Sequence, residues 1–343
     1  MPDDTANQGT TRGAQTLVTG GAGFIGSHLI ERLLHAGDRV TVVDNLSTGR
    51  RTNLPSHPAL TFIEADLAEV LPELATRVGP VDEIYHLAAA VGVKLVMDKP
   101  AESIETNVAL TADLLTAAQT AGPGGGPART LIASSSEVYG KGTGEVFSED
   151  DDVVYGPTTV TRWSYAASKA LDEHLALAHH RDRGLPVAVV RFFNTVGPRQ
   201  VGEYGMVLPR FVEAALADEP LTVFGDGSQS RCFADVRDVV TALPKLLRKD
   251  ASLGRVFNLG ADTPITIREL AETVIRVTES ASSIVTMPFD AAYPHGFEDL
   301  KRRRPDLSRI RAAVGFEPKT PLEATIADLA SSIAAEQQAD AAR

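Results

Sequence analysis

The stretch Thr16–Leu34, "TLVTGGAGFIGSHLIERLL", decides the fold of this chain. It begins with apolar and β-branched residues, ends with apolar residues at helical spacing, and carries three glycines at three-residue intervals between these runs. This pattern predicts a strand, a tight turn and a helix. A turn without side chains lets a phosphate approach the backbone, and the helix N-terminus then offers that phosphate its N–H groups.

Each glycine of the turn has its own role. Gly20 permits the turn, Gly23 lets the backbone approach a pyrophosphate, and Gly26 allows close packing of helix and strand. Asp44 ends the next predicted strand, 24 residues after Gly20. A carboxylate there accepts both ribose hydroxyls of an adenosine and repels a 2′-phosphate. The sequence therefore predicts a dinucleotide site that prefers NAD to NADP.

Short β-branched runs alternate with helical runs over the first part of the chain. Strands are predicted at 16–20, 40–44, 60–64, 83–88, 130–134 and 187–193, and helices at 24–36, 101–121 and 163–183. This alternation is typical of an α/β fold, a Rossmann doubly wound parallel sheet covered by helices on both faces.

The rhythm changes after residue 197. We expect a disordered tail at 1–15, an NAD-binding Rossmann domain at 16–197, and a smaller α+β substrate domain mainly at 198–335, with some chain returning to the first domain near 230–250. In the smaller domain we predict strands at 221–224 and 255–259, and helices at 208–217, 267–278 and 321–335. We expect the chain after residue 334 to fray.

The composition is that of an acidic protein. A formal net charge of -12 disfavours binding to nucleic acid or to an anionic membrane. Cys232 is the single cysteine, and none of the eight histidines stands at metal-ligand spacing with a Cys or Glu, so we expect no metal site. No apolar run can cross a bilayer and no signal segment is recognised, so we expect a cytoplasmic protein.

The motif "YAASK" predicts a catalytic base. Tyr165 and Lys169 are four residues apart on a predicted helix, so both side chains lie on one face. An ammonium beside a phenol lowers the pKa of the phenol and makes Tyr165 a usable base. Ser134 to Glu137 follow the fifth strand at the carboxyl edge of the sheet, where a hydroxyl can share a hydrogen bond with Tyr165 and a substrate alcohol.

Together these motifs resemble the extended short-chain dehydrogenase/reductases that act on nucleotide sugars. The matching stretches, between about residues 16 and 322, are "TGGAGFIGSHL", "DNLSTG", "HLAA", "SSSEVYG", "YAASK" and "RFFNTVGPRQ". The resemblance implies tightly held NAD, a C-terminal domain that grips a UDP-sugar, and a homodimer formed through helices 101–121 and 163–183. The implied cofactor site comprises Gly20, Gly23, Phe24, Ile25, Gly26, Asp44, Asn45, Ser47, Thr48, Gly49, Asp66, Leu67, Leu87, Ala88, Ala89, Asn107, Ser134, Tyr165 and Lys169.

The resemblance also implies roles in catalysis and substrate binding. Ser135 takes the Ser/Thr place beside Tyr165, and Glu137 stands where dehydratases and decarboxylases keep a glutamate. Ser136 stands where 4,6-dehydratases keep an aspartic acid, so dehydration is disfavoured. The implied substrate site comprises Val91, Ser136, Asn194, Thr195, Arg199, Val207, Leu208, Val223, Phe224, Arg231, Arg303 and Asp306. Within it, Arg231 and Arg303 hold the diphosphate, and residues 207–208 and 223–224 border the uracil.

Two residues keep a second interpretation. Asp66 can lie by the adenine or cap a helix, and both can hold. Arg303 belongs to a run of arginines that can also be a solvated basic turn. We favour a phosphate contact because planar guanidinium groups suit phosphate oxygens and an acidic protein needs cations there.

We expect the reaction to begin at the sugar C4 hydroxyl and to form a 4-ketose. Return of the hydride to the other face gives 4-epimerisation, whereas loss of a C5 carboxylate gives decarboxylation. Arg199 is a candidate for pinning such a carboxylate, but Val201 stands where many glucuronate epimerases carry a second basic residue.

We predict 4-epimerisation of UDP-glucuronate to UDP-galacturonate. The alternatives are a UDP-glucuronate decarboxylase (UDP-xylose synthase), a UDP-glucose or UDP-N-acetylglucosamine 4-epimerase, a simple NAD-dependent reductase, and a non-catalytic NAD-sensing regulator.

Overall fold

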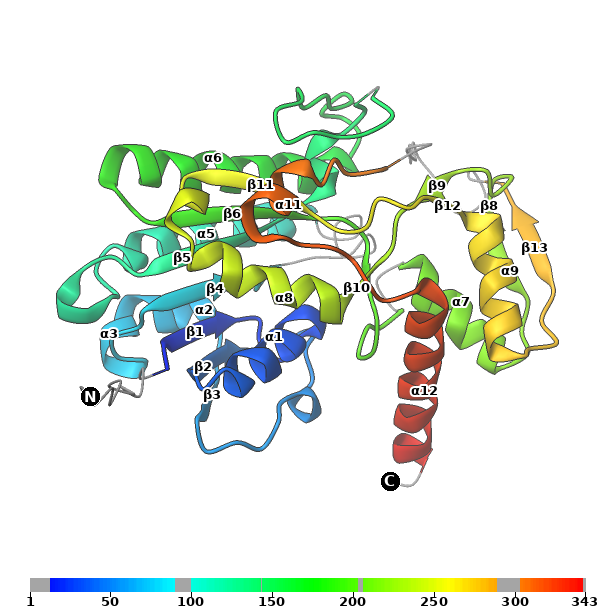
Figure 1. Cartoon of the computed structure of the whole chain (residues 1–343), viewed down its shortest axis with the longest axis horizontal. Coiled ribbons are helices and arrows are strands. Elements are labelled where there is room, and N and C mark those ends of the chain that lie inside the picture. The colour runs from blue at the N-terminus through cyan, green and yellow to red at the C-terminus, as the bar shows by residue number, and fades with distance from the viewer. Residues whose placement is uncertain (1–12, 90–99, 143, 203–205, 289–302, 342–343) are drawn as a thin grey trace, which may run out of the picture.

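The computed structural model describes residues 13–89, 100–142, 144–202, 206–288 and 303–341 (Figure 1). Within these residues seven parallel strands form one sheet, in the order β11-β6-β5-β4-β1-β2-β3. The strands are β1 (Gln15–Thr19), β2 (Arg39–Asp44), β3 (Leu60–Glu64), β4 (Glu83–His86), β5 (Arg129–Ser135), β6 (Val187–Phe192) and β11 (Arg255–Leu259). The winding reverses between β1 and β4, and ligands bind at such a point in doubly wound sheets. The predicted fold class is confirmed.

Helices cover both faces of this sheet (Figure 1). One face packs against α1 (Phe24–His35), α8 (Val236–Leu247) and α11 (Ser308–Val314), and the other against α2 (Leu67–Val70), α3 (Leu74–Arg77), α5 (Pro100–Ala118) and α6 (Trp163–Arg183). The two apolar clusters are separate because each face of the sheet buries its own set of side chains. Short 3-10 turns are η1 (Arg51–Asn53), η2 (Leu71–Glu73), η3 (Pro123–Gly125), η4 (Ser136–Tyr139) and η5 (Asp250–Ser252).

The strand β11 lies in the large sheet, whereas the sequence placed residues 255–259 in the smaller domain. It pairs in parallel with β6, with Arg255 opposite Ala188 and Leu259 opposite Phe192. The helix α8 is the crossover between these two strands, but the insertion that follows β6 separates the strand from its helix. The regular strand–helix rhythm is therefore interrupted although the fold continues it.

A smaller unit projects from the sheet unit (Figure 1). It contains the parallel pair β8 (Leu221–Phe224) and β13 (Ile284–Met287) and the helices α7 (Val207–Leu216), α9 (Ile267–Thr278) and α12 (Leu322–Ala341), which share one apolar core. The pairs β7 (Thr195–Val196) with β10 (Ala234–Asp235), and β9 (Ser230–Arg231) with β12 (Ile265–Thr266), form the connections. The helix α12 continues to Ala341, beyond the predicted end at 335.

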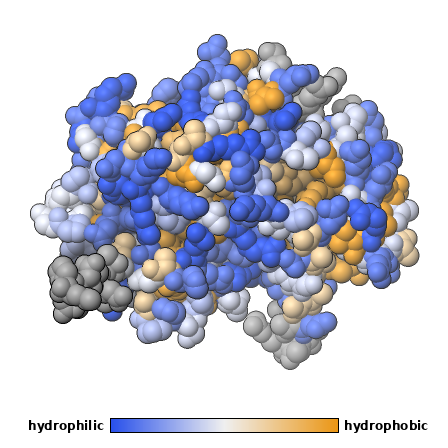
Figure 2. Space-filling view, viewed as in Figure 1, coloured by the Kyte–Doolittle hydropathy of each residue, from blue (hydrophilic) through white to orange (hydrophobic). Residues whose placement is uncertain are grey.

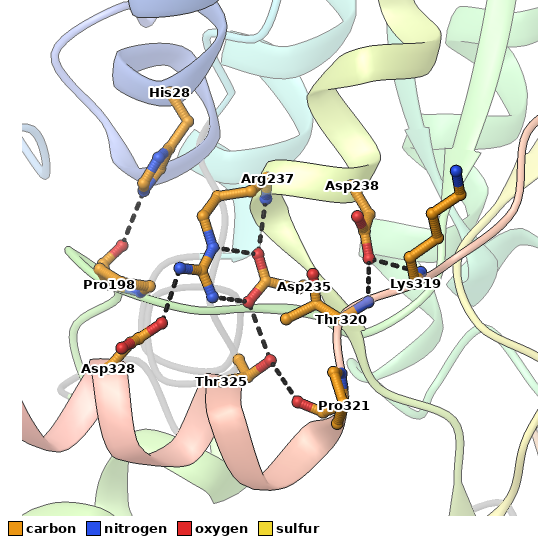
Figure 3. Close-up of polar contacts among 10 residues, drawn as sticks. All are labelled: His28, Pro198, Asp235, Arg237, Asp238, Lys319, Thr320, Pro321, Thr325 and Asp328. Carbon is orange, nitrogen blue, oxygen red and sulfur yellow. Dashed lines mark hydrogen bonds and ion pairs between the residues drawn. The ribbon is translucent and has the colours of Figure 1, made fainter.

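A buried carboxylate at the start of α8 ties the two units together (Figure 3). Asp235 has a fully buried side chain, caps α8, and accepts hydrogen bonds from Arg237 (2.7 Å) and from the hydroxyl of Thr325 in α12 (2.8 Å). Arg237 also pairs with Asp328 of α12 at 2.6 Å. The first turns of α8 and α12 are therefore fixed to each other.

Two further contacts extend this junction (Figure 3). Asp238 accepts the backbone N–H groups of Lys319 and Thr320 at 2.8 and 2.7 Å. His28 of α1 hydrogen-bonds to the carbonyl of Pro198 at 3.1 Å. Because these contacts use backbone groups, they fix the path of the chain on either side of the smaller unit.

The surface is mixed. Figure 2 shows polar side chains over most of the sheet unit and apolar side chains gathered over the smaller unit at the right. Among the described helices, none combines the length and the apolar character needed to cross a bilayer.

Candidate active site

The glycine turn between β1 and α1 leaves no room for side chains. Gly20 has φ +70°, and a Cβ there would lie 2.7 Å from the backbone nitrogen of Ala88. A Cβ on Gly26 would lie 2.4 Å from the carbonyl oxygen of Gly20. No side chain caps α1 at Gly23, so the N–H groups of Phe24, Ile25 and the residue after them remain available for a phosphate.

Asp44 lies beside this turn at the end of β2. Its buried carboxylate accepts the N–H of Ala22 at 2.9 Å and the N–H of Leu46 at 2.8 Å. Each oxygen uses one lone pair in these bonds and keeps another for a ribose hydroxyl. The glycine turn and Asp44 together fit the adenosine diphosphate part of NAD.

The loop after β2 brings several predicted cofactor residues to the turn. Asn45 donates to Asp66 at 3.1 Å, and a Cβ on Gly49 would lie 2.8 Å from the carbonyl carbon of Ala22. Ser47 and Thr48 are exposed at the same place. Asp66 accepts the N–H of the second residue of α2, so its role as a helix cap is confirmed and its contact with adenine stays a prediction.

The end of β4 completes this edge. Residues 87–89 are half-buried, and the N–H of Ala88 donates to the hydroxyl of Thr19 at 3.3 Å. Asn107 is buried in α5, Leu67 is buried at the start of α2, and Ser134 donates its hydroxyl to Glu173 of α6. These cofactor candidates line the carboxyl edge of the sheet at and beside the point where the strand order reverses.

The predicted base lies on the first turn of α6, against the end of β5. The side chain of Ser135 hydrogen-bonds to Tyr165, and its oxygen also accepts the N–H of Glu137 at 3.2 Å. The structure therefore brings Ser135, Tyr165 and Glu137 together, as their sequence motifs predicted.

The prediction that Lys169 lowers the pKa of the Tyr165 phenol is wrong. The Lys169 ammonium donates to the carbonyl of Ala133 and to the carboxylate of Asp172, both at 3.1 Å. Burial and the carboxylates of Glu137 and Asp172 raise the pKa of Tyr165 well above its usual value, although Ser135 opposes them. Asp172 was missed in the sequence, although it stands three residues after Lys169 on the same helix face.

Two buried arginines hold Glu137. Arg303 pairs with one oxygen at 2.6 Å and Arg162 with the other at 3.2 Å, and both guanidinium groups are almost fully buried. Burial raises the pKa of Glu137, but Arg303 and Arg162, helped by Arg231, bring it down to about 2. Glu137 is therefore anionic at neutral pH. Arg162 was missed in the sequence, where its place three residues before Tyr165 was the available signal.

Several of the other predicted substrate residues lie near Glu137 or at the end of β6. Arg231 and Arg303 reach the Glu137 cluster from the second half of the chain, and Asn194 and Thr195 lie just after β6, where Asn194 donates to the carbonyl of Cys232 at 3.3 Å. Ser136 is buried in η4. Asp306 is half-buried and accepts the N–H of the residue two places on at 2.8 Å.

Other predicted substrate residues make contacts outside the Glu137 cluster. Arg199 pairs with Glu31 of α1, and its N–H donates to Ser332 of α12, and neither contact belongs to the Glu137 cluster. Leu208 and Val223 are buried in the core of the smaller unit, which leaves their side chains no surface for a uracil ring.

Three further substrate candidates stay predictions. Phe224 is half-buried, with Arg210 stacked on its ring at 4.9 Å, and Val207 is half-buried at the start of α7. Val91 lies outside the described residues, as do residues 1–12 of the predicted tail.

No cluster of three or more His, Cys, Asp or Glu side chains suited to a metal occurs in the part of the chain that the structure describes. Cys232 is buried, and burial raises the pKa of its thiol to about 12, so it serves packing.

Comparison with protein families gives one match over most of the chain: residues 16–260 match the NAD dependent epimerase/dehydratase family. The UDP-N-acetyl-alpha-D-glucosaminuronate decarboxylase of Bacillus cytotoxicus is 42% identical over 315 residues, 90% of this chain and 94% of that protein. UDP-glucuronic acid decarboxylase 1 of Arabidopsis thaliana is 37% identical over 320 residues, 89% of this chain and 66% of that protein.

Solved structures agree with this fold. The UDP-glucuronic acid 4-epimerase from Bacillus cereus, in complex with UDP-glucuronic acid and NAD, has a TM-score of 0.81 and 26% identity, covering 94% of this chain and 99% of that chain. The UDP-N-acetylglucosamine 4-epimerase from Methanobrevibacter ruminantium has a TM-score of 0.83 and 28% identity, covering 95% of this chain and 100% of that chain.

Proposed function

Because the chain belongs to the NAD-dependent epimerase/dehydratase family, with NAD as its cofactor, we propose that it decarboxylates a UDP-linked uronic acid. UDP-N-acetylglucosaminuronate is the first candidate substrate and UDP-glucuronate is the second. The observation that carries this proposal is the 42% identity to a decarboxylase over 90% of the chain. The predicted 4-epimerisation is not confirmed, and it becomes the second candidate because a UDP-glucuronic acid 4-epimerase shares the fold.

The proposed reaction begins at Tyr165. Tyr165 takes the proton of the C4 hydroxyl, and Ser135, which hydrogen-bonds to Tyr165, orients that hydroxyl. NAD, when bound, accepts the hydride of C4 and returns it at the end of the cycle. The sugar carboxylate is then β to a ketone. As carbon dioxide leaves, the electrons of its bond move toward the C4 oxygen, where the Tyr165 and Ser135 hydroxyls stabilise the developing charge. C5 then takes a proton from solvent, which restores the C4 ketone to which the hydride returns.

The ion pairs of Glu137 hold two arginines in place beside Ser135. Arg162 and Arg303 keep Glu137 ionised beside Ser135. Both oxygens of Glu137 are paired with a guanidinium group, so the cluster is cationic as a whole and suits an anionic substrate. Ser136 offers no acid for the C6 position, so elimination of a hydroxyl is disfavoured.

The surroundings of Arg199 also support decarboxylation. Epimerisation of a uronate needs a cation that pins the carboxylate in place. Arg199 is instead paired with Glu31, and Val201 supplies no second charge. Arg231 and Arg303 are the proposed contacts of the diphosphate, because guanidinium groups match phosphate oxygens.

A homodimer is part of the proposal. The helices α5 and α6 pack side by side on one face of the sheet, and each carries an exposed apolar residue, Ile104 (37%) and Leu171 (46%). A second copy that covers these helices would form a four-helix interface and remove this apolar surface from water.

Product analysis tests the proposed reaction. The purified protein is incubated with each of the two UDP-uronates, and the products are identified by proton NMR. Decarboxylation predicts a UDP-pentose in which C5 carries two protons. A UDP-uronate inverted at C4, with no pentose, would contradict it. Tyr165→Phe is the matched control, because it removes one oxygen atom and is expected to abolish both outcomes.

A further inference from the structure

The buried pair of Lys169 and Asp172 is not explained by the proposed reaction. The two side chains are 4% and 0% exposed, and their charged groups are 3.1 Å apart. The Lys169 ammonium also donates a hydrogen bond to the carbonyl of Ala133 in β5. A buried carboxylate is costly, and replacing a buried ion pair by apolar side chains is often neutral or stabilising. The pair is therefore weak evidence for stability alone, and its position points to function.

A chain of polar contacts extends from this pair into the sheet. Thr111 of α5 hydrogen-bonds to Asp172, and its hydroxyl lies 3.4 Å from Nε2 of His86. Nδ1 of His86 lies 2.8 Å from the hydroxyl of Thr19, the last residue before the glycine turn. Burial lowers the pKa of His86 to about 3, so the ring is neutral where it meets the hydroxyls of Thr19 and Thr111. Asp172 is held from the side of α5 as well as by Lys169.

We propose that Asp172 is a positioning residue for Lys169: it holds the Lys169 ammonium against the end of β5 and offsets the charge that this ammonium would otherwise exert on Tyr165. The inference rests on the proposed role of Tyr165 as the base, but not on the fate of the 4-ketose. With the carboxylate present, less of the lysine charge acts on the phenol. Asp172 thereby sets the pH at which the base becomes active.

A test must separate the effect of Asp172 on the pKa of Tyr165 from the effects of the other charged groups. The charged and titratable groups on α6 and on the elements around it are Lys169 and Asp172 of α6, Glu137 of η4 with its partners Arg162 and Arg303, the neutral His86 of β4, and the pair of Glu173 with Arg191 of β6. Glu137 raises the pKa of Tyr165 together with Asp172. A substitution at residue 172 changes one of these two carboxylates and leaves the other in place.

The test is Asp172→Asn, which keeps the shape and removes the charge. We expect the acidic limb of the kcat/KM profile to move roughly one pH unit lower, because a like charge beside the phenol is lost. We expect Asp172→Glu to restore the limb. A limb that stays in place while the melting temperature falls would overturn the proposal and leave a structural role. Asp182→Asn is the matched control, since Asp182 is exposed on the same helix.

A second measurement needs no turnover. The tyrosinate absorbance of the NAD-loaded protein is titrated, with Tyr165→Phe subtracted. A lower midpoint in Asp172→Asn supports the inference even if no UDP-uronate is consumed, in which case the proposed function fails alone. An unchanged midpoint overturns the inference whatever the reaction. If the Asn variant does not fold, Asp172→Ser makes the same prediction, because it also removes the charge.

Discussion

The carboxylate of Glu137 shows how single residues decide the chemistry of this site. Glu137 and Arg303 were both predicted from their motifs, but the sequence does not tell that they form an ion pair, since 166 residues separate them. Arg162, at the start of α6, pairs with the other carboxylate oxygen of Glu137. A single sequence reveals residue types at a site, whereas their pairing depends on how the fold brings distant segments together.

Glu137→Gln tests the charge at this position. We expect kcat for carbon dioxide release to fall by roughly 10²-fold, because the two arginines that Glu137 holds beside Ser135 are displaced. Arg162 and Arg303 would also lose their ionised partner, so a lower melting temperature is expected. Release of labelled carbon dioxide measures the rate, and Glu272→Gln, an exposed site on α9, is the control. An unchanged kcat would remove Glu137 from the mechanism.

The buried ring of His86 predicts a pH dependence of stability. Its pKa is about 3 in the folded chain against the usual 6.5. Below pH 6.5 the unfolded chain takes up a proton that the folded chain does not, so the free energy of unfolding falls as the pH drops from 7 toward 3. Urea unfolding should show a loss on the order of 2 kcal/mol between pH 7 and pH 5 from this group. In His86→Gln the loss should shrink by that amount, and an equal loss would contradict the assignment.

Among the elements, α6 carries most of the site. The spacing of Tyr165 and Lys169 predicted a shared helix face, and the observed helix has the predicted bounds, Trp163–Arg183. The expected lowering of the Tyr165 pKa is not found, because burial and the carboxylates of Glu137 and Asp172 raise that pKa, and the Lys169 ammonium pairs with Asp172. Spacing predicts which side chains can meet, but the partner a lysine selects depends on burial and on competing carboxylates.

The outer face of α6 predicts the oligomeric state. Leu171 is exposed in the single chain. We expect the wild-type protein to be a dimer in light scattering after size-exclusion chromatography, and Leu171→Glu to shift it to monomer, because a charge is buried in the interface. Leu216→Glu, on α7 of the smaller unit, should leave the mass unchanged. A monomeric wild type, or a dimer that survives Leu171→Glu, would contradict the proposed interface.

The junction of α8 and α12 predicts a stability difference (Figure 3). Asp235 has a fully buried side chain, caps α8 and bonds to Arg237 and Thr325. Asp235→Asn should lower the free energy of unfolding by roughly 2 kcal/mol, since a buried charge-assisted cap is lost. Asp328→Asn removes a half-exposed partner of Arg237 and should cost less than about 1 kcal/mol. Equal losses would show that the junction does not depend on the buried carboxylate.

At the scale of the whole molecule, the site lies where two units meet. Asp44, Ser135 and Tyr165 come from the sheet unit, and Arg231 and Arg303 reach Glu137 from the later part of the chain. The net charge is -12, yet guanidinium groups gather at this point. This arrangement suits an anionic substrate held beside a dinucleotide.

The global topology was predictable except at one edge. Six of the seven strands follow from the alternation of β-branched and helical runs between residues 16 and 197. The seventh strand, β11, was assigned to the smaller domain, since the insertion after β6 conceals the link to its crossover helix. Local patterns predict elements, whereas sheet membership depends on contacts across the whole chain.

The central claim is that the carboxylate of a UDP-uronate leaves at the site of Tyr165 and Glu137. The most direct measurement follows a substrate labelled with carbon-13 at C6 by carbon NMR. Our account predicts that the label appears as carbon dioxide and bicarbonate, at the rate at which the UDP-pentose forms. A label that stays in a UDP-uronate while the configuration at C4 changes would contradict it.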